Sequence, residues 1–270
     1  MKLQLITLSI LLVACKSKTP TETQEQAPSP AATTLPEAPA PAIDAAAKAL
    51  VLPPADPLPQ APLGLPLVPS PGFNTNTPEK VALGALLFSE PRLSLEGKLA
   101  CASCHQPEHA FSSQAAVNKT AAGKLNRRHT PSLLNLAYHD AYYWDGRATP
   151  MEAQILGHWQ GQLSLAPLTA IEALAEDPIY IAHFKRSFGS EPTPDRAVEA
   201  LAAFVRTRLS GGSAWDLHEA GEAHAVSEQV VAGARIFNER AGCATCHTPP
   251  LYTDLRYYGV GVRDNEASAD

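Results

Sequence analysis

The stretch "LACASCHQPEHAF", from Leu99 to Phe111, decides the fold of this chain. Cys101, Cys104 and His105 stand in it with the spacing C-x-x-C-H, which is the signature of covalent c-type haem attachment. Two thiols three positions apart can form thioethers with both vinyl groups of one haem, and the adjacent imidazole then reaches the iron. The stretch therefore predicts a haem c group with His105 as its proximal ligand.

A second C-x-x-C-H motif stands near the C-terminus, in "AGCATCHTPPL". Its thiols are Cys243 and Cys246, and its imidazole is His247. Two C-x-x-C pairs are also compatible with a structural zinc site, and with exported disulfides or thioredoxin-like redox pairs. None of these alternatives explains why a histidine follows the second cysteine both times. The two motifs together predict two covalently bound haem c groups, with His247 as the second proximal ligand.

The fifth cysteine, Cys15, closes the segment "LLVAC" after an apolar stretch from Leu3 to Val13. A lysine followed by a short apolar stretch is typical of a signal peptide, whereas a membrane span needs about 20 apolar residues. The four residues that end at Cys15 resemble the bacterial lipobox, so residues 1–15 are interpreted as a lipoprotein signal peptide with lipidation at Cys15. An ordinary secretory signal is the alternative. Both interpretations place the protein in the bacterial cell envelope, either lipid-anchored and facing the periplasm or free in the periplasm.

Residues 16–71 are rich in proline and alanine, and 14 of the 25 prolines of the chain fall there. Such a segment cannot bury enough apolar surface to offset its ordering entropy, and proline favours an extended chain. We expect a disordered linker that tethers a folded body to the membrane through the Cys15 lipid. The net charge of −6 argues against a nucleic-acid partner.

Helix-start signals recur through the rest of the chain, and no segment shows a convincing strand pattern. Thr77 and Thr193 each precede a proline, Ser227 precedes a helical period, and residues 149–152 read as a capping box with proline at the first helical position. The sequence therefore predicts a mainly α fold. We expect two small cytochrome c-like haem domains packed together, an N-terminal one at 72–166 and a C-terminal one at 167–270.

Four stretches then resemble the bacterial di-haem cytochrome c peroxidase family, which includes the tryptophan-modifying enzyme MauG. They are "LGALLFSEPRLSLEGKLACASCHQPEHAFS", "RRHTPSLLNLAYHDAYYWDGRATPMEAQILG", "ALAAFVRTRLSGGSAWD" and "AGCATCHTPPLYTDLRYYGVGV". The resemblance runs from Gly72 to Val262 in the order of the family. It implies that the N-terminal haem reacts with peroxide and that the C-terminal haem stores electrons.

The resemblance also assigns roles to individual residues. Trp144 matches the tryptophan that lies between the two haems and passes electrons, whereas Trp159 and Trp215 match no such position and are expected to be packing residues. Gln154 matches a glutamine of the peroxide pocket, and Tyr143 matches the aromatic residue that precedes the tryptophan.

On the peroxide side, this chain departs from the family pattern. Ser164 stands where the family has an acid–base glutamate, and a hydroxyl does not exchange a proton near neutral pH as a carboxylate does. His158 is a candidate substitute because imidazole titrates in the right range, although a histidine on a helix is more often structural. Ala121 or a neighbour occupies the place of a loop histidine that blocks the peroxide haem in other members, which favours an open or water-ligated first iron. His129 replaces an asparagine that helps bind calcium, and imidazole is a poor ligand for this hard cation, so a calcium site has only weak support.

The sixth ligand of the second iron is also missing from the expected place. The family uses a methionine or tyrosine well downstream of the second motif, but this sequence ends 23 residues after His247. Met151 is an improbable ligand because it stands at a helix start. Local candidates that the sequence cannot rank are Tyr257, Tyr258, His218 and His224.

These features predict a di-haem c-type peroxidase that reduces hydrogen peroxide to water with electrons from a small periplasmic donor, a cytochrome c or a cupredoxin. Gln154 and Trp144 are the expected catalytic residues. One alternative is a MauG-like oxidase that modifies a tryptophan of a partner protein. Another is a lipid-tethered electron-transfer cytochrome without peroxide chemistry, whose sign would be two six-coordinate low-spin haems that do not react with peroxide.

Overall fold

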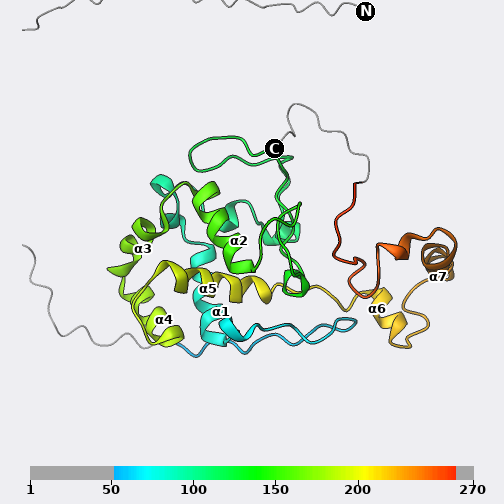
Figure 1. Cartoon of the computed structure of the whole chain (residues 1–270). Helices are drawn as coiled ribbons and strands as arrows, with labels where there is room; N and C mark the ends of the chain where they lie inside the picture. The colour runs from blue at the N-terminus through cyan, green and yellow to red at the C-terminus, as the bar shows by residue number, and fades with distance from the viewer. Residues whose placement is uncertain (1–51, 260–270) are drawn as a thin grey trace, which may run out of the picture. The chain divides into compact units, whose positions relative to one another are not determined.

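The structure, a computed structural model, describes residues 52–259 and is built from helices and irregular connections (Figure 1). The helices are α1 (Pro78–Phe88), α2 (Met151–His158), α3 (Pro167–Ala175), α4 (Pro178–Phe188), α5 (Pro194–Arg206), α6 (Ala214–Glu219) and α7 (Glu228–Arg235). Shorter 3-10 turns are η1 (Gly72–Asn74), η2 (Pro91–Leu93), η3 (Leu95–Gly97), η4 (Cys101–Ser103), η5 (Pro107–His109), η6 (Leu136–Tyr138) and η9 (Cys243–Thr245), and η7 (Trp159–Leu163) and η8 (Ile236–Arg240) are π-helical turns. Residues 52–259 hold isolated β-bridges but no strand. The prediction of a mainly α fold is confirmed.

Three helices begin where the sequence places their caps. The side chain of Thr77 accepts a hydrogen bond from the backbone N–H of Lys80 at the start of α1, and Thr193 caps α5 in the same way. Ser227 caps α7. Each hydroxyl satisfies one of the backbone donors that a helix N-terminus leaves free.

The predicted capping box at 149–152 does not form. Helix α2 begins after Pro150 with no side-chain cap. The carboxylate of Glu152 instead accepts hydrogen bonds from Asn74 and Arg206. These two partners, of which Arg206 is charged, come from other parts of the fold and take the carboxylate away from the helix start.

The core lies where α1 crosses α5, side by side in Figure 1. Leu83 and Leu87 of α1 are fully buried, together with Phe204 and its neighbours on α5. Gly84 stands at the closest approach, where a Cβ atom would collide with the backbone carbonyl of Ala200. Glycine is needed at this position because the two backbones almost touch.

Helices α3, α4 and α5 share this core. Helix α4 contacts α1, α5 contacts both α1 and α2, and α3 contacts η2. These three helices therefore pack against the part of the chain that carries the first C-x-x-C-H motif. The predicted domain boundary at residue 166 stays a prediction about which residues surround which haem.

The folded part begins earlier than the composition predicts. Within the expected linker, residues 52–71 lie against helices and loops of the body. The Tyr138 hydroxyl donates to the Pro66 carbonyl at 2.8 Å, the Gly212 N–H donates to the Leu63 carbonyl at 3.0 Å, and Arg186 bonds the Pro53 carbonyl. A proline-rich segment lacks many backbone donors, but its carbonyls remain free to accept such bonds. The predicted signal peptide, Cys15 and residues 16–51 lie outside the described residues.

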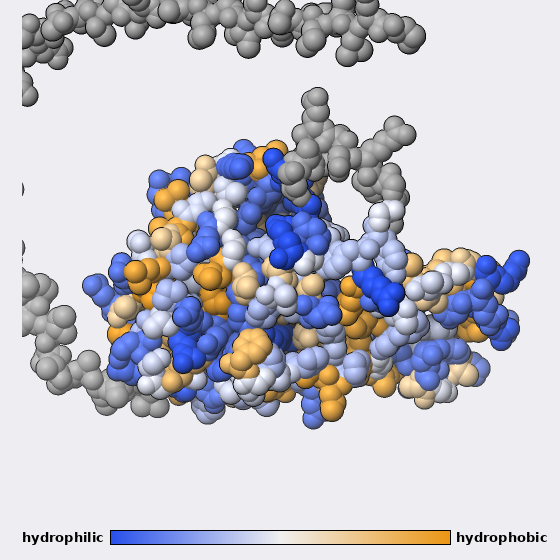
Figure 2. Space-filling view, viewed as in Figure 1, coloured by the Kyte–Doolittle hydropathy of each residue, from blue (hydrophilic) through white to orange (hydrophobic). Residues whose placement is uncertain are grey.

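The surface of the described residues carries both apolar and hydrophilic side chains. In the view of Figure 2, apolar residues are scattered among hydrophilic ones. None of the helices between residues 52 and 259 combines the length and apolar character that a membrane span requires.

Candidate haem sites

The first motif presents His105 in a fixed orientation. Cys101 opens the turn η4, and the His105 backbone N–H donates to the Cys101 carbonyl at 2.9 Å. The ring of His105 is buried, with its Nδ1 atom 2.9 Å from the Phe111 carbonyl and the Phe88 ring beside it. Because Nδ1 is engaged as a donor, Nε2 is the nitrogen left to bind a metal. This carbonyl-held tautomer is the arrangement that orients ligating histidines generally.

The electrostatics of the motif agree with haem attachment better than with a thiolate site. Burial raises the pKa of Cys101 to about 12 and also raises the pKa of Cys104. Burial lowers the pKa of His105, against the raising effect of its backbone hydrogen bonds, so the imidazole is neutral and ready to ligate. Zinc needs deprotonated thiols, and the described residues contain no cluster of three or more His, Cys, Asp or Glu placed to hold a metal ion. The donor set of two thiols and one oriented imidazole fits haem c.

Helix α2 brings the ring of His158 close to the ring of His105. The ring centroids of His105 and His158 are 5.9 Å apart. A narrow cavity beside them is lined by both thiols of the motif and by His158. Burial, and the neighbouring His105, lower the pKa of His158 to about 3, so this imidazole is neutral as well.

Gln154 lies on the same face of α2 as His158, because residues four apart in a helix lie one above the other. The backbone carbonyl of Gln154 accepts a hydrogen bond from the Tyr143 hydroxyl at 3.2 Å. The Tyr143 ring in turn lies under the Arg147 guanidinium, 3.8 Å from its carbon. This chain of contacts ties the loop before α2 to the helix that carries Gln154.

Ser164 and Ala121, two positions where the chain departs from the family pattern, both form local hydrogen bonds. Ser164 ends the turn η7 with a left-handed backbone, and its hydroxyl donates to the Gly161 carbonyl at 3.3 Å. Ala121 is buried, and its N–H donates to the Gln162 carbonyl at 2.8 Å. The loop around Ala121 is thus bonded to the segment that follows His158.

Trp144 is 58% exposed, and its indole N–H donates to the His129 carbonyl at 2.9 Å. Its neighbour Asp145 forms ion pairs with Arg128 and Arg147. These bonds tie the "WDGR" turn to the segment that carries Arg128 and His129. Trp159, by contrast, is buried with its N–H on the Leu93 carbonyl, as expected of a packing residue.

Both ring nitrogens of His129 are engaged within the fold. Nε2 lies 3.0 Å from the Ser112 hydroxyl, and Nδ1 lies 3.1 Å from the Ala115 carbonyl. The side chain therefore cross-links two stretches of the loop region.

The second motif repeats the local geometry of the first. The His247 backbone N–H donates to the Cys243 carbonyl at 2.9 Å, and His247 Nδ1 lies 3.1 Å from the Tyr252 carbonyl. Nε2 is again the free nitrogen. Phe237 packs near both His247 and Tyr252, but His247 itself is exposed. The same sequence pattern thus gives the same turn in a less buried setting.

The candidate sixth ligands of the second haem are spread over the described chain. Met151 is buried in the core formed with α1 and α5, which leaves it unsuited to the exposed second motif. Tyr258 bonds the Asp254 carboxylate, and the Tyr257 ring lies against Gly146 of the "WDGR" turn. His218 stacks near Trp215, and the remaining candidate, His224, is exposed.

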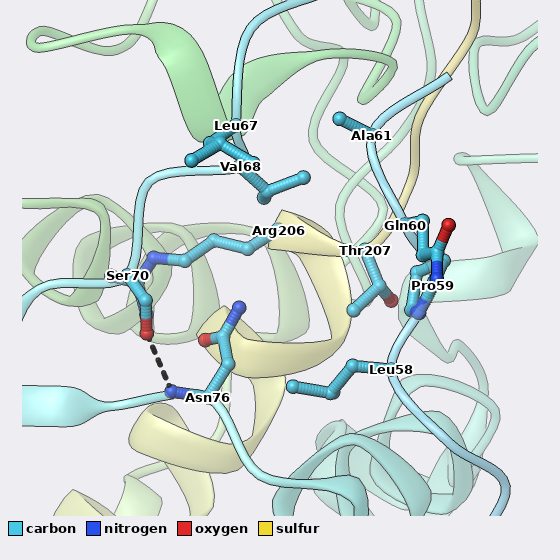
Figure 3. Close-up of a pocket in the computed structure, with 10 residues that line it drawn as sticks. All are labelled: Leu58, Pro59, Gln60, Ala61, Leu67, Val68, Ser70, Asn76, Arg206 and Thr207. Atoms are coloured by element: carbon cyan, nitrogen blue, oxygen red, sulfur yellow. Dashed lines mark hydrogen bonds between the residues drawn. The ribbon is translucent and has the colours of Figure 1, made fainter. Parts of the chain in front are cut away.

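A larger cavity, of about 580 Å³, lies apart from both motifs (Figure 3). It is lined by Leu58, Pro59, Gln60, Ala61, Leu67, Val68, Ser70, Asn76, Arg206 and Thr207. The Arg206 side chain runs along it, and the Asn76 N–H bonds the Ser70 hydroxyl at 2.9 Å. The motif cysteines are not among the residues that form its wall.

A buried ion pair behind α2 escaped the sequence reasoning. Arg206 bonds Glu152 at 2.6 Å, and Asn74 donates to the same carboxylate oxygen at 2.7 Å. No local pattern joins these residues, since Arg206 is 54 positions from Glu152 and Asn74 is 78 positions from it. The pair fixes α2, and with it the face of Gln154 and His158, to α5.

Comparison with known proteins identifies the family of this chain. The profile of the family described as di-haem cytochrome c peroxidase matches residues 78–224. The methylamine utilization protein MauG of Methylorubrum extorquens is 38% identical over 201 residues, which are 73% of this chain and 57% of that protein. Cytochrome-c peroxidase IdrP1 of Denitromonas iodatirespirans is 34% identical over 221 residues, 77% of this chain and 57% of that protein.

Solved structures resemble the fold. A MauG-like protein associated with microbial copper homeostasis superposes with a TM-score of 0.61 at 26% identity, covering 77% of this chain and 61% of that chain. The di-haem peroxidase BthA from Burkholderia thailandensis gives a TM-score of 0.58 at 22% identity, over 75% of this chain and 60% of that chain. The chain spans 57% of the length of each of the two sequence relatives named above. With a family profile over more than half of its length and 38% identity to MauG over 73% of it, the chain belongs to the di-haem cytochrome c peroxidase family.

Proposed function

We propose that this protein is a di-haem c-type peroxidase that reduces hydrogen peroxide to water. The observation that supports the proposal is the position of His158 on α2, whose ring lies 5.9 Å from the ring of the buried His105, with Gln154 one turn earlier on the same face of the helix. The reaction consumes one peroxide, two electrons and two protons and gives two waters. The electrons come from a small periplasmic donor, a cytochrome c or a cupredoxin.

Two sets of residues hold the proposed haems. Cys101 and Cys104 form the thioethers of the peroxide-reacting haem, and His105 ligates its iron. Cys243, Cys246 and His247 do the same for the electron-transfer haem. Each bound haem supplies a redox-active iron.

The other proposed roles belong to side chains near the first motif. Gln154 carries an amide that can donate to and accept from a peroxide oxygen, and its place on α2 is fixed by Glu152 two residues earlier. Trp144 provides an aromatic path for electrons from the second haem, held in place by its bond to the His129 carbonyl. A mildly acidic protein, with a net charge of −6, suits a basic electron carrier.

The location is part of the proposal. A chain exported by residues 1–15 and lipidated at Cys15 would sit on the periplasmic side of a membrane, where c-type haem is attached and small redox carriers diffuse. Residues 16–51 would then separate the folded body from the lipid.

The proposal is tested with haem-loaded protein, reduced cytochrome c and hydrogen peroxide. We expect two cytochromes c to be oxidised per peroxide, at a rate well above that of a free haem c peptide. Gln154→Leu should lower kcat/KM for peroxide about 100-fold, the scale seen when one oriented donor is removed from a reacting centre. Gln160→Leu, an exposed glutamine in the following turn, is the matched control and should leave the rate unchanged.

Absence of turnover above the free haem peptide would rule out the peroxidase. Equal rates for the Gln154 and Gln160 variants would show that Gln154 does not contact peroxide.

A MauG-like oxidase is the second candidate function, favoured by the 38% identity to MauG. Its substrate would be a tryptophan on a partner protein. A gain of oxygen on a co-expressed partner, found by mass spectrometry only when His105 is intact, would select this function over peroxide reduction.

A further inference from the structure

We propose that His158 is the axial ligand of the first iron on the side opposite His105, so that the peroxide haem is closed by a helix residue in the resting protein. This inference rests on the proposed function, whose first haem it regulates. It replaces the expectation of an open or water-ligated iron, which follows from the missing loop histidine alone.

The distance between the two rings carries the inference. A histidine nitrogen binds a first-row transition metal at about 2 Å, and an imidazole centroid lies roughly 1 Å behind its ligating nitrogen. Two imidazoles that ligate one iron from opposite sides therefore have centroids about 6 Å apart. The observed separation of the His105 and His158 centroids is 5.9 Å.

The free nitrogens agree with this arrangement. His105 commits Nδ1 to the Phe111 carbonyl and keeps Nε2 available. No hydrogen bond from another described residue reaches the ring of His158. The nitrogens of the His158 ring are therefore open to a ligand, and an iron between the two rings would bind both imidazoles. The cavity that joins His158 to the thiols of Cys101 and Cys104 lies at the same place.

The position of His158 is fixed by the residues that follow it. Helix α2 ends at His158 and passes into the π-helical turn η7, a type of turn that is frequent at functional sites. Trp159 anchors this junction through its bond to the Leu93 carbonyl. The Ala121 N–H holds the far end of η7 through the Gln162 carbonyl. These contacts keep the imidazole over His105 in the folded protein.

The consequence is a gate on the peroxide haem. A peroxide molecule would have to displace His158 before it could reach the iron. In this chain the blocking imidazole would come from α2, whereas the loop around Ala121 serves as a support.

Absorption and EPR spectra of the oxidised, haem-loaded protein test the inference without any turnover. We expect the His105 haem of the wild type to be low-spin with two histidine ligands. In His158→Ala one of the two haems should become high-spin, and free imidazole added to the variant should restore the low-spin signal. His158→Met should give instead the charge-transfer band of a His/Met haem. The control His183→Ala removes a buried histidine of α4 and should leave both haem spectra unchanged.

A high-spin first haem in the wild type would overturn the inference, whatever the variants do. So would a His158→Ala protein whose two spectra match those of the wild type. If the spectra change as expected while no form reduces peroxide, the ligand assignment stands and the peroxidase function fails.

Discussion

Removal of one partner from the buried ion pair behind α2 should strongly destabilise the protein. The side chains of Arg206 and Glu152 are only 5% and 13% exposed, and they are joined at 2.6 Å. Glu152→Gln keeps the size of the side chain and a bond to Asn74, but it leaves the Arg206 cation without its counter-charge. One nitrogen of that guanidinium, Nη1, already lacks a hydrogen-bond partner among the described residues. The remaining bonds therefore compensate little for the lost counter-charge.

The magnitude follows from the burial of the pair. Breaking a buried ion pair by removing one partner costs about 3–5 kcal/mol, because a charge then stays in a poorly solvated place. For a folded part of about 200 residues, each kcal/mol lowers Tm by about 2–4 °C. Glu152→Gln should therefore lower Tm by about 6–20 °C.

The assays are thermal unfolding of the haem-loaded protein, which gives Tm, and urea unfolding compared at equal m-values, which gives the free energy of unfolding; both are followed by far-UV circular dichroism. Glu191→Gln makes the same chemical change in an exposed pair with Lys185, whose side chains are 65% and 58% exposed. Such a pair contributes less than about 1 kcal/mol, so this control should unfold close to the wild type.

A loss below 1 kcal/mol in Glu152→Gln would refute the reasoning, because it would show that water reaches the pair. The double variant Glu152→Leu/Arg206→Met gives a second check. It removes both charges together, and replacing a buried pair by apolar residues is often neutral or stabilising. Its stability should therefore exceed that of Glu152→Gln.

Two further predictions concern the core and its edge. Gly84→Ala should destabilise by about 1–3 kcal/mol, because the new methyl group would meet the Ala200 carbonyl where α1 crosses α5; a gain in stability, as helix propensity alone predicts, would contradict this packing. Burial alone would raise the pKa of Glu90, but hydrogen bonds from Arg92 and Tyr180 hold this pKa below its usual value. Glu90 therefore stabilises the fold at pH values above its unfolded-state pKa. This contribution is lost as the pH falls through the folded-state pKa. Glu90→Gln should cost about 1–3 kcal/mol at pH 7, and its difference from wild type in urea titrations should shrink below about pH 4; a difference that stays constant with pH would exclude the carboxylate as its source.

The two haem motifs and the helical character were predictable from the sequence because they depend on neighbours in the chain. C-x-x-C-H sets its own turn, and the structure gives His105 and His247 the same backbone bond and the same free nitrogen. The caps at Thr77 and Ser227 are equally local, since a hydroxyl and a backbone N–H three residues later suffice.

The failures of prediction all involve long-range partners. Residues 52–71 read as linker because composition does not reveal that Tyr138 and Arg186 bond their carbonyls. Glu152 was predicted to complete a capping box because no local sequence pattern indicates that Asn74 and Arg206 bind its carboxylate.

The sequence by itself predicted where two haems would attach and which histidines would ligate them, and it determined that the surrounding chain is helical. Only the tertiary structure decided that His105 is buried while His247 is exposed, and that His158 stands 5.9 Å from His105. The reason is physical: a motif fixes the geometry of a few consecutive residues, whereas the opposite side of an iron is formed by whichever helix the core places there. Helix α2, which carries His158, is held to α5 by a buried ion pair.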